Sequence, residues 1–260
     1  MIKLFFNQNK ILMSILLFGI LFSNNRNCDD GYMEINDLCF YQQDIDVLQS
    51  FIDNSYSSGI DLGCSDNDGW YCGSPNPQMD SIDDGWYWNV VDSVSYTFVN
   101  GNGIIEPLEL GIQEWQNGRL KSLMCGAYIY CELSGEIPAS INNLTEINQF
   151  RIEYNYLSGH IPESICELGL NDNDYLEFDL TGNNLCPPYP GCIENGIGYQ
   201  DPENCYSLGD INYDGFIDVI DIVEIVSIIL NGGFNPNADM NSDSILNVQD
   251  IIIVVDLIIN

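Results

Sequence analysis

Apolar residues in the middle of the chain follow a pattern that repeats at a regular spacing. The segment LSGEIPASINNL at 133–144 returns as LSGHIPESICEL at 157–168. A third copy, YLEFDLTGNNL at 175–185, follows a four-residue insertion, and LKSLMCGAYIYCEL at 120–133 aligns before the first copy. Because repetition of this kind is typical of stacked units, each copy is predicted to contribute a short strand and then a loop.

Two strongly apolar runs near the end of the sequence predict two short helices, VIDIVEIVSIIL at 219–230 and IIIVVDLII at 251–259. Polar residues of the first run recur at every third position: Asp218, Asp221, Glu224 and Ser227. Such a stripe is typical of a helix with one polar side. Since about fifty residues are too few to bury this much apolar surface, an exposed remainder predicts a partner.

An earlier apolar run, ILMSILLFGILF at 11–22, follows Lys3 and Lys10. It is shorter than the roughly 20 residues of a membrane span and is typical of a secretory signal. The sequence therefore predicts a signal peptide over residues 1–23, a secreted or cell-surface protein, and no membrane span in the mature chain. No clear small-x-small triplet marks a cleavage site, so an uncleaved anchor is the alternative.

Charge narrows the range of partners. The 260 residues contain 39 Asp and Glu against 6 Lys and Arg, a formal net charge of −33, and no Lys or Arg follows Arg151. Binding to nucleic acid or to anionic lipid depends on Lys and Arg, so both are excluded. Divalent cations are the natural partners of such a chain, although much of the acidity serves solubility alone.

All 10 cysteines follow the predicted signal peptide, which indicates a disulfide framework. Short separations favour three pairs: Cys28 with Cys39, Cys64 with Cys72, and Cys186 with Cys192. Cys131 has two interpretations, a buried free thiol or a bridge to Cys125. No CxxC motif occurs, so a zinc ribbon has no support.

Acidic and amide side chains at 209–221, GDINYDGFIDVID, have the spacing of a calcium-binding loop. The predicted ligands at loop positions 1, 3, 5, 7, 9 and 12 are Asp210, Asn212, Asp214, the Phe216 carbonyl, Asp218 and Asp221. The pattern returns at 238–250, where the corresponding ligands are Asp239, Asn241, Asp243, the Ile245 carbonyl, Asn247 and Asp250. Two Ca²⁺ sites are therefore predicted. The second site is expected to bind Ca²⁺ more weakly, because its loop has Ser244 at the turn position that glycine, Gly215, occupies in the first loop.

This pair of loops, each leading into a helix, resembles a type I dockerin over residues 208–260. The resemblance implies Ca²⁺-dependent docking onto a cohesin-bearing scaffold protein. In that family, loop positions 10 and 11 help to choose the cohesin, and here they are Val219, Ile220, Val248 and Gln249. These residues depart from the common Ser-Thr pair, which leaves the class of partner open.

The central copies resemble plant-type leucine-rich repeats over residues 120–185. The resemblance implies a short solenoid whose strands project the side chains that contact a protein or glycan ligand. The residues expected on this face are Gln149, Arg151, Glu153, Tyr154, Glu177 and Asp179. For Arg151, a salt bridge to Asp179 or Glu177 is an equally good interpretation.

Together these patterns predict a multidomain chain: a short leucine-rich-repeat solenoid of the α/β type with disulfide-rich caps, then a small all-α dockerin. The expected divisions are the signal peptide 1–23, a Cys-rich cap region 24–119, the repeats with their C-terminal cap 120–205, and the calcium-binding module 206–260.

A further segment, NGNGIIEPLE at 100–109, has part of a calcium-loop pattern, but Phe98 at position 1 cannot be a ligand. It is interpreted as a turn into a helix, with a third calcium site as the alternative.

No catalytic constellation accompanies these motifs. The single histidine, His160, lies in a repeat turn, and neither a nucleophile motif nor a phosphate-binding glycine loop occurs. The sequence thus predicts a secreted, non-catalytic binding protein, whose repeats recognise protein or glycan and whose end docks to a cohesin-like scaffold. The alternative is an accessory or enzymatic subunit of a polysaccharide-degrading complex.

Overall fold

The computed structural model describes residues 28–60, 62, 73–81, 88–126, 128–201, 205 and 207–259. The predicted signal peptide and the predicted Cys64–Cys72 bridge lie outside these residues. The strands are β1 (Tyr32–Ile35), β2 (Leu38–Tyr41), β3 (Asn89–Val91), β4 (Val94–Tyr96), β5 (Ile112–Gln116), β6 (Arg119–Met124), β7 (Ser134–Gly135), β8 (Gln149–Arg151), β9 (Tyr156–His160), β10 (Phe178–Asp179) and β11 (Asn184–Cys186). The α-helices are α2 (Gln42–Ser57), α3 (Val219–Leu230) and α4 (Val248–Ile259), and the 3₁₀ helices include η1 (Pro77–Asp80), η2 (Pro107–Glu109), η3 (Ala139–Asn143), η4 (Glu163–Leu168) and η6 (Pro236–Ala238).

The largest sheet has six strands in the order β10-β8-β6-β5-β3-β4. Neighbours β10, β8 and β6 run parallel, whereas β5 pairs antiparallel with β6 and β4 pairs antiparallel with β3. A register shift between Glu114 and Trp115 marks a bulge. A bulge inserts one residue into the alternation of a strand, so Leu120 and Leu123 of β6, three residues apart, can both be fully buried.

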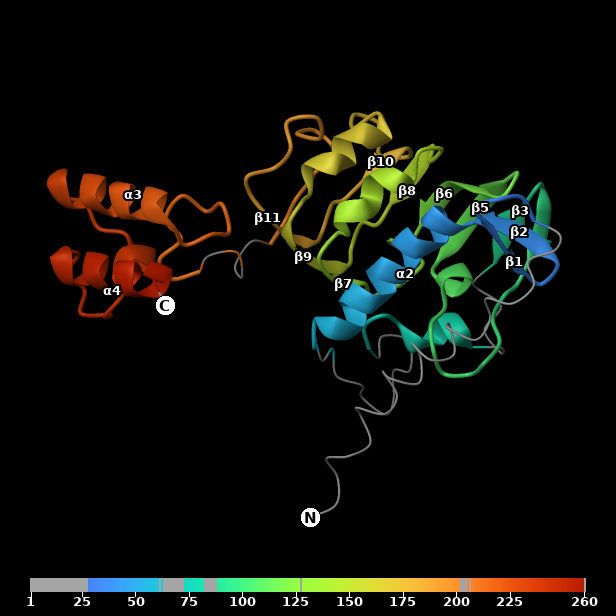
Figure 1. Cartoon of the computed structure of the whole chain (residues 1–260), viewed down its shortest axis with the longest axis horizontal. Helices are drawn as coiled ribbons and strands as arrows, with labels where there is room; N and C mark the ends of the chain where they lie inside the picture. Colours follow the sequence, from blue (N-terminus) through green and yellow to red (C-terminus); the bar gives the residue numbers. More distant parts are fainter. Residues whose placement is uncertain are drawn as a thin grey trace, which may run out of the picture.

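A second, three-stranded sheet is wholly parallel, in the order β11-β9-β7. Helix α2 packs against β7 and against η2 and η3 (Figure 1). Its buried side chains recur at helical spacing and include Ile45, Leu48, Phe51 and Ile52. The region predicted as a Cys-rich cap, 24–119, therefore supplies a helix to the core.

Aromatic rings connect α2 to the larger sheet. The ring centroids of Phe51 and Phe150 lie 6.2 Å apart, and those of Phe150 and Phe178 lie 6.3 Å apart. The row therefore runs from the helix through β8 to β10, and it belongs to one continuous core that also contains Trp115 and Leu157. Burial of apolar area on this scale is what holds the sheets and the helix together.

The fold class expected from the sequence is wrong. The described residues form a mixed α/β structure with several sheets, and neither a leucine-rich-repeat solenoid nor an all-α dockerin is identified in them. Only β7, β9 and β11 of the repeat strands form a sheet of their own. Strands β6, β8 and β10 share theirs with β5, β3 and β4, which come from the region predicted as a cap and extend that sheet in mixed orientation. Beyond residue 206, long loops and η6 connect the two helices.

Four disulfides join described cysteines, and their pairing corrects part of the prediction. Cys28–Cys39 is confirmed, and Cys125–Cys131 settles the alternative for Cys131 in favour of the bridge. The predicted Cys186–Cys192 bridge is wrong, since the pairs are Cys166–Cys192 and Cys186–Cys205. Cys166 lies in η4 and Cys192 lies after β11, so the partner of Cys192 in space is not its neighbour in sequence.

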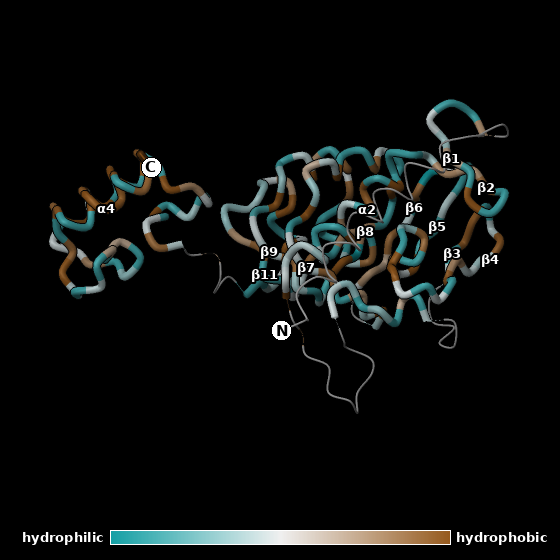
Figure 2. Tube along the Cα trace, turned by 60° about the horizontal axis from the view of Figure 1, so that its bottom comes forward, coloured by the Kyte–Doolittle hydropathy of each residue, from teal (hydrophilic) through white to brown (hydrophobic). Residues whose placement is uncertain are grey.

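The C-terminal helices α3 and α4 lie side by side (Figure 1). They share a small core of Ile211, Ile225, Ala238 and Val254. Hydrophobic stretches recur along α4 in Figure 2, and many apolar side chains of both helices stay exposed. No helix in the described part of the chain has both the length and the apolar character needed to cross a membrane.

Candidate calcium site and docking surface

The first predicted loop folds around the carboxylate of Asp210. This side chain is 1% exposed; its Oδ1 accepts the Asp214 N–H at 3.2 Å, and its Oδ2 accepts the Gly215 N–H at 3.0 Å. Gly215 has φ +86°, a left-handed conformation that glycine adopts without a Cβ clash. The buried carboxylate therefore fixes the sharp turn of the loop.

Asp221, the last predicted ligand, ties the loop to the start of α3. It is fully buried, and its Oδ1 accepts the Ile211 N–H at 2.7 Å and the Asn212 N–H at 3.2 Å. Its Oδ2 accepts the Asp218 N–H at 2.8 Å, which closes a capping box at the helix N-terminus. One carboxylate thus orders both ends of the loop.

The second loop, at 239–250, repeats this frame. Asp239 accepts the Asp243 N–H at 3.1 Å and the Ser244 N–H at 2.7 Å. Asp250, fully buried, accepts the Met240 N–H at 3.0 Å and the Asn247 N–H at 2.9 Å. The backbone of Ser244 has φ +65°, so this residue takes, with strain, the left-handed conformation that Gly215 takes freely in the first loop.

The remaining predicted ligands also occupy equivalent positions. Asn212 donates to Asp214 at 2.8 Å, and Asn241 donates to Asp243 at 2.9 Å. Both residues that were predicted to supply carbonyls, Phe216 and Ile245, are exposed and donate their N–H to the preceding aspartate. At the helix starts, Asp218 accepts the Ile220 N–H, and Asn247 accepts the Gln249 N–H.

The donor set fits a hard cation. Asp210, Asp221, Asp239 and Asp250 are all nearly or fully buried, and no Lys or Arg lies beyond Arg151 to neutralise them. Buried charges require a partner, and Ca²⁺ is bound by about six to eight carboxylate, amide and carbonyl oxygens. Among the described residues, however, no three His, Cys, Asp or Glu side chains converge as a metal cluster. Here each buried carboxylate accepts backbone N–H groups, so binding would require these oxygens to turn toward the ion.

Three of the four predicted partner-binding residues, Val219, Ile220 and Val248, are exposed apolar side chains. Together with two exposed neighbours they make up what we call the docking surface: Val219, Ile220 and Val223 on α3, and Val248 and Ile252 on α4. Val219 and Val248 occupy equivalent positions and are 65% and 63% exposed. Gln249 is also exposed and occupies the position that corresponds to Ile220. Both helices thus present similar apolar side chains beside their loops.

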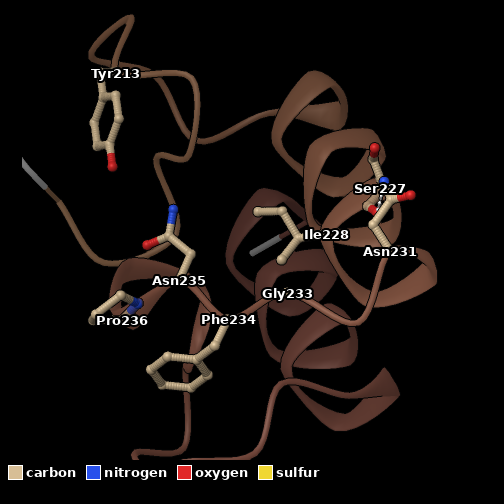
Figure 3. A pocket seen from close by; sticks show the side chains of 8 residues that line it. All are labelled: Tyr213, Ser227, Ile228, Asn231, Gly233, Phe234, Asn235 and Pro236. Carbon is tan, nitrogen blue, oxygen red and sulfur yellow. Dashed lines mark hydrogen bonds between the residues drawn. The ribbon is translucent and has the colours of Figure 1, made fainter.

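A cavity of about 570 Å³ lies at the C-terminal end of α3 (Figure 3). Its walls combine aromatic and aliphatic side chains, Tyr213, Ile228 and Phe234, with the polar side chains of Asn231 and Asn235. Asn231 donates to the Ser227 carbonyl at 2.8 Å and so caps the helix end. Sequence analysis did not find this cavity; its only local signal is the Gly232-Gly233 break before Phe234.

The predicted ligand face of the repeat region is only partly available. Arg151 Nη2 lies 2.5 Å from Glu153 Oε1, so the partner of Arg151 is neither of the two acids that the sequence suggested. Burial raises the pKa of Glu153, and both Arg151 Nε and Glu153 Oε2 lack a hydrogen-bond partner among the described residues. Gln149 is also engaged, accepting from Ser122 at 2.6 Å and donating to the Leu176 carbonyl at 2.6 Å.

Three members of that face remain accessible to different degrees. Tyr154 is 65% exposed, and its ring lies against Gly182. Glu177 accepts the Asn171 N–H at 2.8 Å, and Asp179 accepts the Thr181 N–H at 2.9 Å. Asp179 lines a second cavity, which is considered below.

The segment at 100–109 is organised by a residue outside it. Asp80 accepts the N–H groups of Gly101 and Gly103, both at 2.6 Å, and lies at the end of η1. The turn then leads into η2, where Glu109 accepts the Glu106 N–H at 2.9 Å. Burial, with Asp80 and Glu106 nearby, raises the pKa of Glu109 to about 8. Sequence reasoning missed Asp80 because it lies well before the loop in the chain, in a separate 3₁₀ helix.

Comparison of the chain with protein-family models, curated proteins and solved structures finds no match. Four disulfides are compatible with an extracellular protein.

Proposed function

We propose that this chain is a secreted, non-catalytic binding protein. Its segment 206–260 binds two Ca²⁺ and docks onto a cohesin-like scaffold protein, and its N-terminal part recognises a protein or glycan ligand. The observation that carries the proposal is the repetition of one hydrogen-bond frame in two loops, 210–221 and 239–250, each followed by a helix with exposed apolar residues.

The calcium role rests on charge. Each loop contains two nearly or fully buried aspartates, and none of the ion pairs formed by the described residues involves them. A divalent cation bound between them would offset their repulsion and stabilise the folded loop, so that binding energy becomes folding energy. Helices α3 and α4 start at the last ligand-bearing turns, so the ion would also fix the positions of the helix N-termini.

The docking role rests on apolar exposure. Val219, Ile220, Val248 and Ile252 are each more than half exposed, although the shared core of this segment contains only four buried residues. Exposed apolar patches on this scale mark interaction sites, and apolar anchors contribute most of the energy of such interfaces. Since none of these four side chains is an oxygen ligand, ion binding and docking should be separable by mutation.

Capture by immobilised type I cohesin domains tests the proposal. The chain from residue 24 onward should bind in millimolar Ca²⁺ and be released by EDTA. The double variant Val219→Asp/Ile220→Asp should lower affinity well over tenfold while Ca²⁺ uptake persists. A matched control is Ile104→Asp, which changes an apolar side chain that is 51% exposed in the N-terminal part. Capture that ignores EDTA, or equal losses in the double variant and the control, would refute the proposal.

A further inference from the structure

A second cavity, of about 280 Å³, lies beside β10 at the edge of the six-stranded sheet. Its walls include Asp172, Asn173, Tyr175, Asp179, Thr181 and Asn195. Of these residues, only Asp179 belongs to the ligand face predicted from the sequence. The cavity is therefore a feature of the fold, formed where the loop before β10 and the segment after β11 meet the last strand.

Hydrogen bonds within the wall use several of its donors and leave several acceptor oxygens free. Asn195 donates its backbone N–H and its Nδ2 to Asp172 Oδ2 at 3.0 and 3.2 Å, and Asn173 Nδ2 donates to Asp172 Oδ1 at 2.9 Å. The Thr181 N–H donates to Asp179 Oδ1 at 2.9 Å. Among the described residues, no hydrogen bond engages Asp179 Oδ2 or the amide oxygens of Asn173 and Asn195. The cavity thus offers a ligand mainly oxygen acceptors.

Charge at the cavity is negative. Asp172 and Asp179 both line it, and the nearest basic residue by strand register is Arg151, which is opposite Asp179. That guanidinium is already paired with Glu153, so Arg151, Glu153 and the two cavity aspartates together carry two net negative charges. A cleft lined by one sign of charge concentrates ligands of the opposite sign.

An aromatic ring completes the cavity. Tyr175 lines it and is 67% exposed, so its ring is accessible to a ligand. The face of a tyrosine attracts a cation placed above it, and a guanidinium can stack there while it donates to oxygens at its edge. Acceptors, negative charge and an aromatic ring in one cavity favour an organic cation.

We propose that this cavity binds an arginine side chain in a basic segment of a protein ligand. The inference rests on the proposed ligand-binding role of the N-terminal part, and it selects protein over glycan. A phosphate, a sulfate or an acidic sugar would meet two carboxylates without a free basic group. A neutral sugar would gain nothing from the negative charge of the cavity, which favours a cation. Arginine fits better than lysine, because its planar fork reaches several acceptors at once.

Calorimetry with short peptides tests the assignment on the chain from residue 24 onward in Ca²⁺. The probes are Gly-Gly-Arg-Gly-Gly, its lysine counterpart, and the citrulline counterpart, which keeps the shape of arginine but is neutral. The arginine peptide should bind at least tenfold more tightly than the citrulline peptide and should weaken as salt is added. Equal binding of the two peptides, or binding of a neutral hexasaccharide that excludes the arginine peptide, would overturn the proposal.

Variants locate the binding. Asp179→Asn keeps an oxygen to accept the Thr181 N–H, so the fold should survive while affinity for the arginine peptide falls at least tenfold; Tyr175→Ala should also weaken binding. Glu194→Gln removes an exposed charge that does not line the cavity and should leave affinity unchanged. Equal effects of Asp179→Asn and Glu194→Gln would assign binding to overall charge and overturn the site. Cohesin capture, measured in parallel, should be unaffected by Asp179→Asn, so loss of one activity is distinguishable from loss of the other.

Discussion

Arg119 and Asp44 form a two-bonded ion pair between β6 and α2: Arg119 Nε lies 2.9 Å from Asp44 Oδ2, and Nη2 lies 3.0 Å from Oδ1. Asp44 is fully buried and also accepts the Leu120 N–H at 2.9 Å. The hydrogen bonds to Asp44 are the largest cause that raises the pKa of Arg119. Because this geometry satisfies the buried carboxylate on several sides, the pair fixes how the helix meets the sheet.

Removal of Arg119, the ion-pair partner of the buried Asp44 carboxylate, should destabilise the fold. Arg119→Ala leaves Asp44 buried without a cation, and the loss of one partner of a buried pair costs about 3–5 kcal/mol of unfolding free energy. Lys121→Ala is the control, because its partner Glu146 is largely exposed and such pairs contribute about 1 kcal/mol or less. Urea denaturation measures both variants. Similar midpoints for the two would contradict the role assigned to Asp44.

The disulfide pairing predicts a specific peptide map. Digestion without reduction should link the peptide that contains Cys166 to the one that contains Cys192, and not Cys186 to Cys192. Because no Lys or Arg follows residue 151, pepsin is used instead of trypsin. The double variant Cys166→Ser/Cys192→Ser opens a bridge with a sequence separation of 26 and should cost about 3 kcal/mol of stability. Cys28→Ser/Cys39→Ser, with a separation of 11, should cost slightly less.

Local patterns were the ones that could be predicted. The apolar run at 219–230 matches α3, and α4 begins three residues before the predicted start, where Asn247 provides the cap. Both loops follow from side chains that are close together in the sequence. Long-range pairing could not be read in the same way. Three features depend on which segments meet in space: the pairing of β5 with β6, the hydrogen bonds of the Asp80 carboxylate to the distant 100–109 segment, and the Cys166–Cys192 bridge. The cavity beside β10 depends on the same packing.

Glu109 should make stability depend on pH. Its pKa in the folded chain is about 8, above the ordinary value of 4.5, so between these values the folded state holds a proton that the unfolded state has released. Stability is therefore highest below about pH 4.5 with respect to this group and falls as the pH rises toward 8. Asp80, Glu106 and Tyr56 are the titratable neighbours.

The variant Glu109→Gln should remove this contribution. The melting temperature of the variant minus that of the unmodified chain should increase as the pH is raised from 4.5 to 8. Glu114→Gln changes an exposed carboxylate on β5 and should leave the pH profile unchanged. Melting followed by circular dichroism at several pH values measures both variants, and parallel profiles for Glu109→Gln and the unmodified chain would refute the argument.

The two calcium loops differ at one residue in a way that mutation can reverse. Gly215 and Ser244 both have positive φ, +86° and +65°, but only Ser244 has a Cβ that crowds the backbone there. Relief of this strain by Ser244→Gly should stabilise the second loop by about 1 kcal/mol, which raises Ca²⁺ affinity at that site about fivefold. Ser244→Ala is the control, since it removes the hydroxyl but keeps Cβ. Calorimetric titration should show two unequal sites in the unmodified chain and in Ser244→Ala, and nearly equal sites in Ser244→Gly. If alanine and glycine raise the affinity equally, the hydroxyl and not the backbone strain weakens the second site.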